Sequence, residues 1–197
     1  MSKVNFDSTS SVSFGELGPT TSLQLMFAKL QLELAETAKT QAMDKMDAIA
    51  KAQDEQKFVS QLLNEARQSK ANAKNKNSED ITTTYYKYDK DGKITGSYTE
   101  TAPKGKNYNP MSNDMVKYMD EHNLAYDKTG NDHMHTAEEW DVAITALEGR
   151  LEELGTNTQQ EMVYIQDYMG QYNSYLQGAN TQIANSNQTL TSLARGQ

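Results

Sequence analysis

Apolar residues recur every three or four positions along two long stretches of the chain that contain no proline. Because an α-helix has 3.6 residues per turn, this spacing places the apolar side chains on one helical face. The first stretch follows Pro19, and the second opens with Thr136 and Glu139 at the spacing of a capping box. The pattern therefore predicts two long helices, over residues 21–76 and 136–197.

Each predicted helix carries an apolar stripe that it has no means of burying alone. In the second helix the steps alternate between four and three, with one extra four near Thr158, which is typical of a coiled-coil seam with a stutter. A break near Gly155 stays open, because glycine weakens a helix. We expect the helices to pair antiparallel within one chain, or between subunits in an assembly. The residues expected at this coiled-coil and self-assembly interface are Leu23, Phe27, Leu30, Leu34, Ile165, Tyr172, Leu176, Ala179, Ile183, Leu190 and Leu193.

The segment between the helices, residues 77–135, has a different composition. Residues 81–101 are rich in β-branched and aromatic side chains around an Asp-Gly turn, which predicts a β-hairpin. A short helix is predicted over residues 112–123. Because the hairpin closes locally, we expect the insertion from Ile81 to Pro110 to be surface exposed and dispensable for the helical core. The predicted fold is mainly α, a long antiparallel coiled-coil helical hairpin with a small central insertion that contains a β-hairpin.

Composition and charge limit the kinds of partner and location that the chain can have. The net charge is −8 and the pI is near 4.9, so the surface repels phosphate backbones and nucleic-acid binding is not expected. The chain has no cysteine, and no apolar run approaches the roughly 20 residues of a membrane span. Residues 1–20 are rich in Ser and Thr and lack the apolar centre of a Sec signal. We expect this segment to be disordered, as a frayed terminus or as an export signal that is read unfolded.

Candidate chemistry along the chain is sparse. Ligand positions one, three, five and twelve of a calcium loop are matched by Asp127, Thr129, Asn131 and Glu138. Asp132, however, occupies the position that needs glycine. Weak calcium binding by residues 127–138 and a plain acidic loop both stay open. The histidines and acidic pairs lack the spacing of a zinc or catalytic site. We therefore expect no enzymatic activity, no cofactor and no metal, although an enzyme or metal module in the insertion is a third hypothesis.

Three segments resemble a known family. The run LQLMFAKLQLELAETAKTQAMDKMDAIAKAQ is similar to the first helix of the hydrophilic translocators of type III secretion, the EspA and SseB filament and tip proteins. The run SNDMVKYMDEHNL resembles their central helix, and HTAEEWDVAITALEGRLEELGTNTQQEMVYIQDYMGQYNSYLQ resembles their C-terminal helix. The predicted hairpin over 81–101 departs from that pattern.

The resemblance implies a secreted structural subunit of a needle tip or extracellular filament at the bacterial cell surface. Such a protein is exported without a Sec signal, self-assembles into a homo-oligomer through its terminal helices, and connects needle and translocon proteins. It is held by a secretion chaperone before export. The alternative is a cytoplasmic coiled-coil adaptor or secretion chaperone, and dependence on secretion separates the two.

Overall fold

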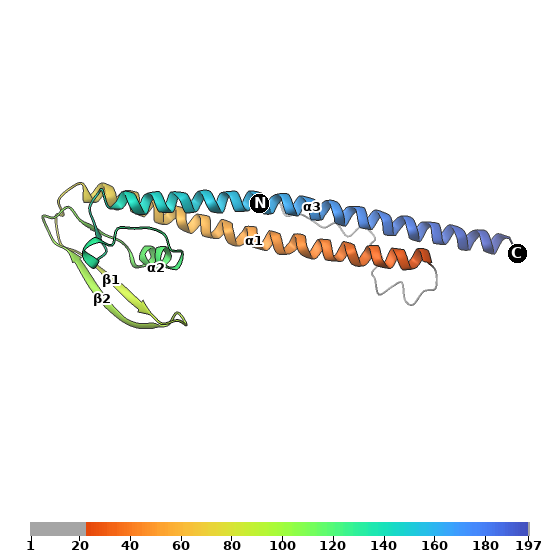
Figure 1. The fold of residues 1–197 in the computed structure, drawn as a ribbon, viewed down its shortest axis with the longest axis horizontal. Coiled ribbons are helices and arrows are strands. Elements are labelled where there is room, and N and C mark those ends of the chain that lie inside the picture. Colours follow the sequence, from red (N-terminus) through yellow and green to blue (C-terminus); the bar gives the residue numbers. More distant parts are fainter. Residues whose placement is uncertain (1–22, 197) are drawn as a thin grey trace. The chain divides into compact units, whose positions relative to one another are not determined.

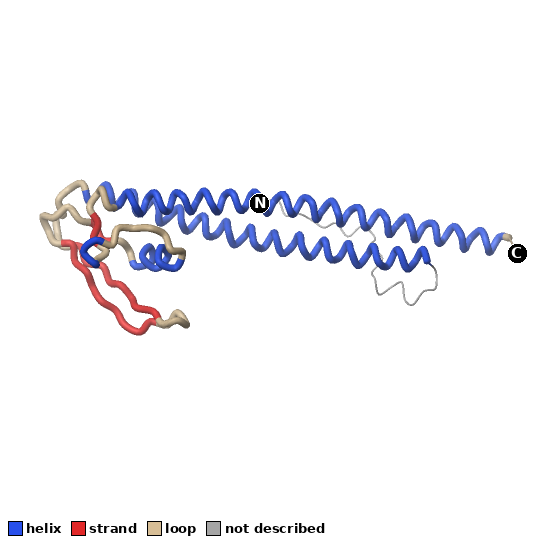
Figure 2. Tube along the Cα trace, viewed as in Figure 1, coloured by secondary structure: helices blue, strands red, loops and turns tan. Residues whose placement is uncertain are grey.

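A computed structural model describes residues 23–196 of the chain (Figure 1). Along the chain, one long helix precedes and another follows a segment of short strands, loops and short helices, which Figure 2 colours by secondary structure. The elements in chain order are α1 (Leu23–Ala73), β1 (Ile81–Tyr88), β2 (Ile94–Ala102), β3 (Asn109–Pro110), α2 (Asn113–Glu121), the 3-10 helix η2 (Thr129–Asn131), β4 (Met134–His135) and α3 (Trp140–Arg195). The expected export segment, residues 1–20, lies outside the described residues.

Helix α1 packs antiparallel on helix α3, as the sequence predicts. In the contacting pairs, residue numbers rise along α1 as they fall along α3. Within residues 23–50 and 158–196, Gln31 lies against Gly178, and Lys45 pairs with Glu161 at 3.0 Å. Within residues 51–157, Arg67 pairs with Glu148 at 2.8 Å. Helix α3 also continues through Gly155, so the break considered there does not occur.

Residues 51–157 form one compact unit with its own core, which α1 and α3 do not build alone. Trp140 at the start of α3 is fully buried, and Met111, Met115 and Met119 from the insertion are buried with it. Methionine fills irregular space well, because its side chain is unbranched and flexible. The short helix α2 therefore contributes its apolar face to the same core as the long helices. The remaining buried members of this core are Val59, Leu62, Leu63, Ala66, Ala73, Tyr118, Tyr126, Ala137, Ala143, Ile144, Leu147 and Leu154.

The capping box expected before α3 is present. The backbone N–H of Thr136 donates to Oε2 of Glu139 at 2.8 Å, and the N–H of Glu139 donates to Oγ1 of Thr136 at 3.4 Å. These bonds satisfy two amides that the start of a helix leaves unpaired. They fix the point at which the chain turns into α3, next to buried Trp140.

The β-hairpin expected over 81–101 is also present, with Ile81 opposite Ala102 and Tyr88 opposite Ile94. Its turn is held by Asp89, whose Oδ1 accepts the N–H groups of Asp91 and Lys93, each at 2.9 Å. Gly92 takes a positive φ of 76°, which glycine adopts without strain.

The expectation that the whole insertion is surface exposed is wrong on one face of the hairpin. Tyr85 is 1% exposed and Ala102 is fully buried. The Tyr85 hydroxyl donates to the carbonyl oxygen of Met111 at 2.6 Å, and its ring lies 4.5 Å from the ring of His133. An isolated two-stranded hairpin is only marginally stable in water, and this buried face supplies the packing that it lacks.

The buried hydroxyl of Tyr85 gives a direct test of how firmly the hairpin is attached. Tyr85→Phe leaves the ring in place but removes the donor to the Met111 carbonyl, and we expect the free energy of unfolding to fall by about 1–3 kcal/mol. The neighbouring Tyr86 is exposed, so Tyr86→Phe should change the free energy of unfolding by less than about 0.5 kcal/mol. Urea denaturation followed by circular dichroism measures both. Equal effects of the two variants would contradict the attachment described here.

Candidate functional site

The two terminal portions of the long helices, residues 23–50 of α1 and 158–195 of α3, meet along a line of small side chains. On α1 the buried positions are mostly alanine, namely Ala28, Leu32, Ala35, Ala38 and Ala42. On α3 the fully or nearly fully buried positions are Ala179 and Ser186. A side chain at Gly178 would collide with the amide of Gln31. Small residues allow two helices to pack closely. This contact leaves many of the large apolar side chains of the terminal portions exposed.

The apolar residues predicted for the α1 interface lie on a different face from this alanine line. Leu23, Phe27, Leu30 and Leu34 are 66%, 50%, 49% and 38% exposed. At about 100° per residue, their mean direction lies roughly a third of a turn around the helix from the alanines. The structure therefore places these four side chains together, with Met26 beside them, on a face of α1 that α3 leaves uncovered within the described residues.

The residues predicted on α3 divide into two groups. Ala179 is buried, and Ile165, Tyr172, Leu176 and Ile183 are partly buried along the face that meets α1. Leu190 and Leu193 are instead 59% and 65% exposed.

Leu190 and Leu193 are uncovered because α3 outruns the described part of α1. Since Gln31 lies against Gly178 in an antiparallel pair, Leu23 is level with about residue 186 of α3. Ser186 is the last buried residue of α3, and every described residue after it is exposed. We call the exposed set Leu23, Met26, Phe27, Leu30, Leu34, Leu190 and Leu193 the terminal apolar surface.

Two features of the terminal portions were predicted only in part. Ala38 and Ala42 continue the apolar stripe expected on α1, but Ala28 and Ala35 were missed, because alanine ranks far below leucine in a hydrophobic pattern. Met162, Val163 and Tyr164 form a second exposed apolar stretch on α3, with exposed fractions of 51%, 63% and 51%. Lys45 lies over the Tyr164 ring and pairs with Glu161, and its hydrogen bond to Glu161 raises the pKa of the Lys45 ammonium.

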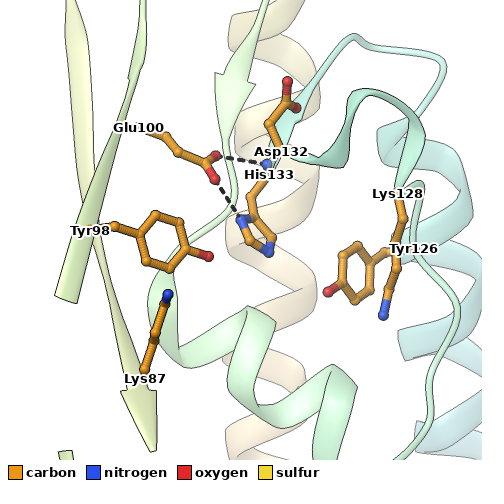
Figure 3. A pocket seen from close by; sticks show the side chains of 7 residues that line it. All are labelled: Lys87, Tyr98, Glu100, Tyr126, Lys128, Asp132 and His133. Atoms are coloured by element: carbon orange, nitrogen blue, oxygen red, sulfur yellow. Dashed lines mark hydrogen bonds and ion pairs between the residues drawn. The ribbon is translucent and has the colours of Figure 1, made fainter. Parts of the chain in front are cut away.

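A polar cavity of about 430 Å³ lies under the hairpin, and Figure 3 shows the side chains that line it. Glu100 accepts the backbone N–H of His133 at 2.7 Å and contacts Nδ1 of the same residue at 3.0 Å. Across the cavity, Asp120 accepts the Tyr126 hydroxyl and the Lys128 ammonium, each at 3.0 Å. These carboxylates are occupied by bonds that tie the hairpin and α2 to the loop before α3. The polar side chains around the cavity therefore serve to hold these elements together.

The sequence left metal binding in the 127–138 loop open. Asp127 uses Oδ1 to accept the N–H of Thr129 at 2.6 Å, and Asp132 uses Oδ1 to accept the N–H of Met134 at 3.0 Å. Among the described residues, no three His, Asp or Glu side chains converge as metal ligands would. His135 is 2% exposed, and burial lowers the pKa of its imidazole.

A third polar cluster joins α1, α2 and α3. Glu55 accepts hydrogen bonds from Arg150 Nη2 at 2.6 Å and from the Tyr118 hydroxyl at 2.7 Å. His122 Nε2 lies 3.8 Å from the same carboxylate. Burial opposes ionisation of Glu55, but the hydrogen bonds from Arg150 and Tyr118 outweigh it, so the pKa of Glu55 is lowered. Burial, followed by the bond to Glu55, raises the pKa of Tyr118 to about 12. The cluster stabilises the packing of three helices.

Comparisons of the chain with protein-family models, with characterised proteins and with solved structures give no match. None of the helices within residues 23–196 is long and apolar enough to cross a membrane. The terminal apolar surface presents seven large apolar side chains that the described part of the chain leaves exposed.

The Glu55 cluster predicts how two similar ion pairs differ in their effect on stability. Arg150→Met should lower the free energy of unfolding by about 1.5–3 kcal/mol at neutral pH, because it removes charge-assisted bonds to a partly buried carboxylate. Arg67→Met breaks a pair whose side chains are 55% and 49% exposed, so it should cost at most about 1 kcal/mol. Urea denaturation of both variants measures the difference.

The effect of Arg150→Met should also depend on pH in a defined direction. Because the folded-state pKa of Glu55 is depressed below its ordinary value of 4.5, the stabilisation is present above pH 4.5 and is lost as pH falls through the folded-state value. The gap between parent and Arg150→Met should therefore narrow on acidification. A gap that widens at low pH, or equal effects of Arg150→Met and Arg67→Met at neutral pH, would contradict this account.

Proposed function

We propose that the chain is a secreted structural subunit of a type III secretion needle tip or extracellular filament, which self-assembles through its terminal helices. The observation that carries the proposal is the terminal apolar surface. Seven large apolar side chains lie on the terminal portions of α1 and α3, each at least 38% exposed in the single chain. Fully burying a side chain of this size contributes about 1.5–3 kcal/mol, so covering several of them favours association strongly.

A second copy of the chain is the partner that fits this surface best. The exposed α1 residues Leu23, Phe27, Leu30 and Leu34 step by four, three and four, which is the spacing of a coiled-coil seam. α1 thus carries two faces, one for α3 of its own chain and one for a helix of another chain. The uncovered end of α3 offers Leu190 and Leu193 as a helix for such a face.

The proposal gives roles to the features that the sequence singled out. In this proposal the chain lies on the bacterial cell surface between needle and translocon proteins, as the resemblance to hydrophilic translocators implies. A secretion chaperone covers the apolar surface before export. The export signal is assigned to residues 1–20. The competing role, a cytoplasmic coiled-coil adaptor or secretion chaperone, shares the helices but does not require export or homo-assembly.

Self-assembly can be tested at the end of α3. Leu190→Asp with Leu193→Asp should abolish oligomers, because burying an unpaired charge in an apolar interface costs several kcal/mol. Both side chains are exposed in the single chain, so helical circular dichroism should be unchanged. Sedimentation velocity measures the particle size.

The matched control is Gln188→Asp with Thr191→Asp, which adds the same charge to the opposite side of the same turns of α3. It should leave the oligomers intact. Unchanged particle size in the leucine double variant, or equal loss in the control, would reject the terminal apolar surface as the assembly interface.

Export can be tested separately. Deleting residues 2–18 should stop the appearance of the protein in the culture medium of cells that carry the secretion machinery. The melting temperature of the purified protein should stay nearly the same, because a Ser- and Thr-rich segment buries little apolar surface. Absence of the intact chain from the medium would support the cytoplasmic adaptor, and continued export of the shortened chain would show that residues 2–18 are not the export signal. Loss of folded protein would show that the segment belongs to the fold.

A further inference from the structure

The two edges of the β1–β2 hairpin are not equivalent. The outer edge of β1 is partly covered, because the backbone N–H of Tyr86 donates to Oδ1 of Asn113 at 2.9 Å. Asn113 is the first residue of α2, which lies on the β1 side of the hairpin (Figure 1). β2 is the strand on the side away from α2, and its outer edge faces away from the rest of the hairpin.

The bond from Tyr86 also fixes which backbone groups of β2 point outward. In an antiparallel pair, residues alternate between those that exchange hydrogen bonds and those whose N–H and C=O point away. Tyr86 points away from β2, so its partner Ser97 points away from β1. By the same alternation, Thr99 and Thr101 also direct their N–H and C=O groups to the open edge.

These outward groups have no partner within residues 23–196. The backbone N–H and C=O groups of Ser97, Thr99 and Thr101 form no hydrogen bond with any described segment outside the hairpin. All three residues are exposed. β2 contains no lysine, arginine or proline, and its β-bulge lies at the end near the turn, away from these three residues. Its only charged residue, Glu100, projects to the opposite face of the hairpin and is held by His133. An open, uncharged edge of this kind is a template for another strand.

We propose that β2 pairs antiparallel with β2 of a second copy, about a two-fold axis at Thr99, to form a continuous four-stranded sheet. In this register Thr99 faces Thr99, and Ser97 faces Thr101, so the three outward residues of each strand exchange hydrogen bonds with each other. Tyr98 faces Glu100, and no like charges are opposed.

The register is bounded at both ends by features of the hairpin. Pro103 follows β2 and lacks the N–H that a further bonded pair requires. The irregular pairing beside Lys87 and Tyr88 interrupts the ladder at the other end. Shifting the axis by two residues in either direction loses a pair, so Thr99 is the position that uses the edge most fully. The contact is isologous and closes at two copies, and it does not depend on the terminal apolar surface.

Reciprocal charges at Thr99 test the two-fold axis. The full chain carrying Leu190→Asp and Leu193→Asp serves as the parent, so that association through the terminal helices is suppressed. Thr99→Lys places two lysines opposite each other, and Thr99→Glu places two glutamates there. We expect each single variant to dimerise about fivefold more weakly than the parent. An equimolar mixture should recover dimers at least as well as the parent. Sedimentation equilibrium over a concentration series measures all three.

The matched control is Thr84→Lys, which adds the same charge on the same face of the hairpin one strand inward, opposite Thr99. It should leave the dimer constant unchanged. Hydrogen exchange supplies the second readout, because the amides of Ser97, Thr99 and Thr101 should become protected as concentration rises. A parent that is monomeric at every concentration, or a mixture that fails to recover dimers, would overturn the proposal. So would equal weakening by Thr84→Lys and Thr99→Lys.

Discussion

The close antiparallel contact between α1 and α3 is the constraint on which the other features depend. In the terminal portions the buried positions of α1 are mostly alanines, and the exposed leucines and phenylalanine of α1 lie on another face. A helix with only one apolar stripe could bury that stripe against its partner helix in the same chain. α1 has two such stripes, and the second, together with the uncovered end of α3, is the physical basis for proposing assembly.

Residues 51–157 contain the connection between α1 and α3, and they form a core of their own. Here the space between α1 and α3 is filled by Trp140 and by methionines from the insertion. The hairpin lies on the same unit through Tyr85 and through the bonds of Glu100 to His133. The side of the hairpin away from these contacts carries threonines and one open strand edge. The insertion therefore combines a structural face with a face that is free to bind.

Local and periodic features were predictable from the sequence, whereas long-range contacts were not. The capping box at Thr136 and the Asp-Gly turn depend only on neighbouring residues, and both are present. The face of α3 that meets α1 includes Ala179, which the sequence predicts at the interface. On α1, however, ranking by side-chain size favoured Leu30 over Ala28, although a close helix pair selects the smaller residue. The burial of Tyr85 rests on Met111 and His133, which lie 26 and 48 positions away along the chain, and no local pattern encodes such contacts.

Cysteine cross-linking between copies tests the central claim most directly, since the natural chain contains no cysteine to interfere. Tagged chains with a single cysteine in place of Leu23 or Leu30 would be mixed before oxidation with untagged chains that carry one in place of Leu190 or Leu193. Gln188 and Thr191, on the other side of α3, serve as reference positions. If α1 of one copy meets the end of α3 of another, the leucine positions of α3 should cross-link strongly and the reference positions weakly. Equal cross-linking at all four α3 positions, or none at any, would contradict this assembly.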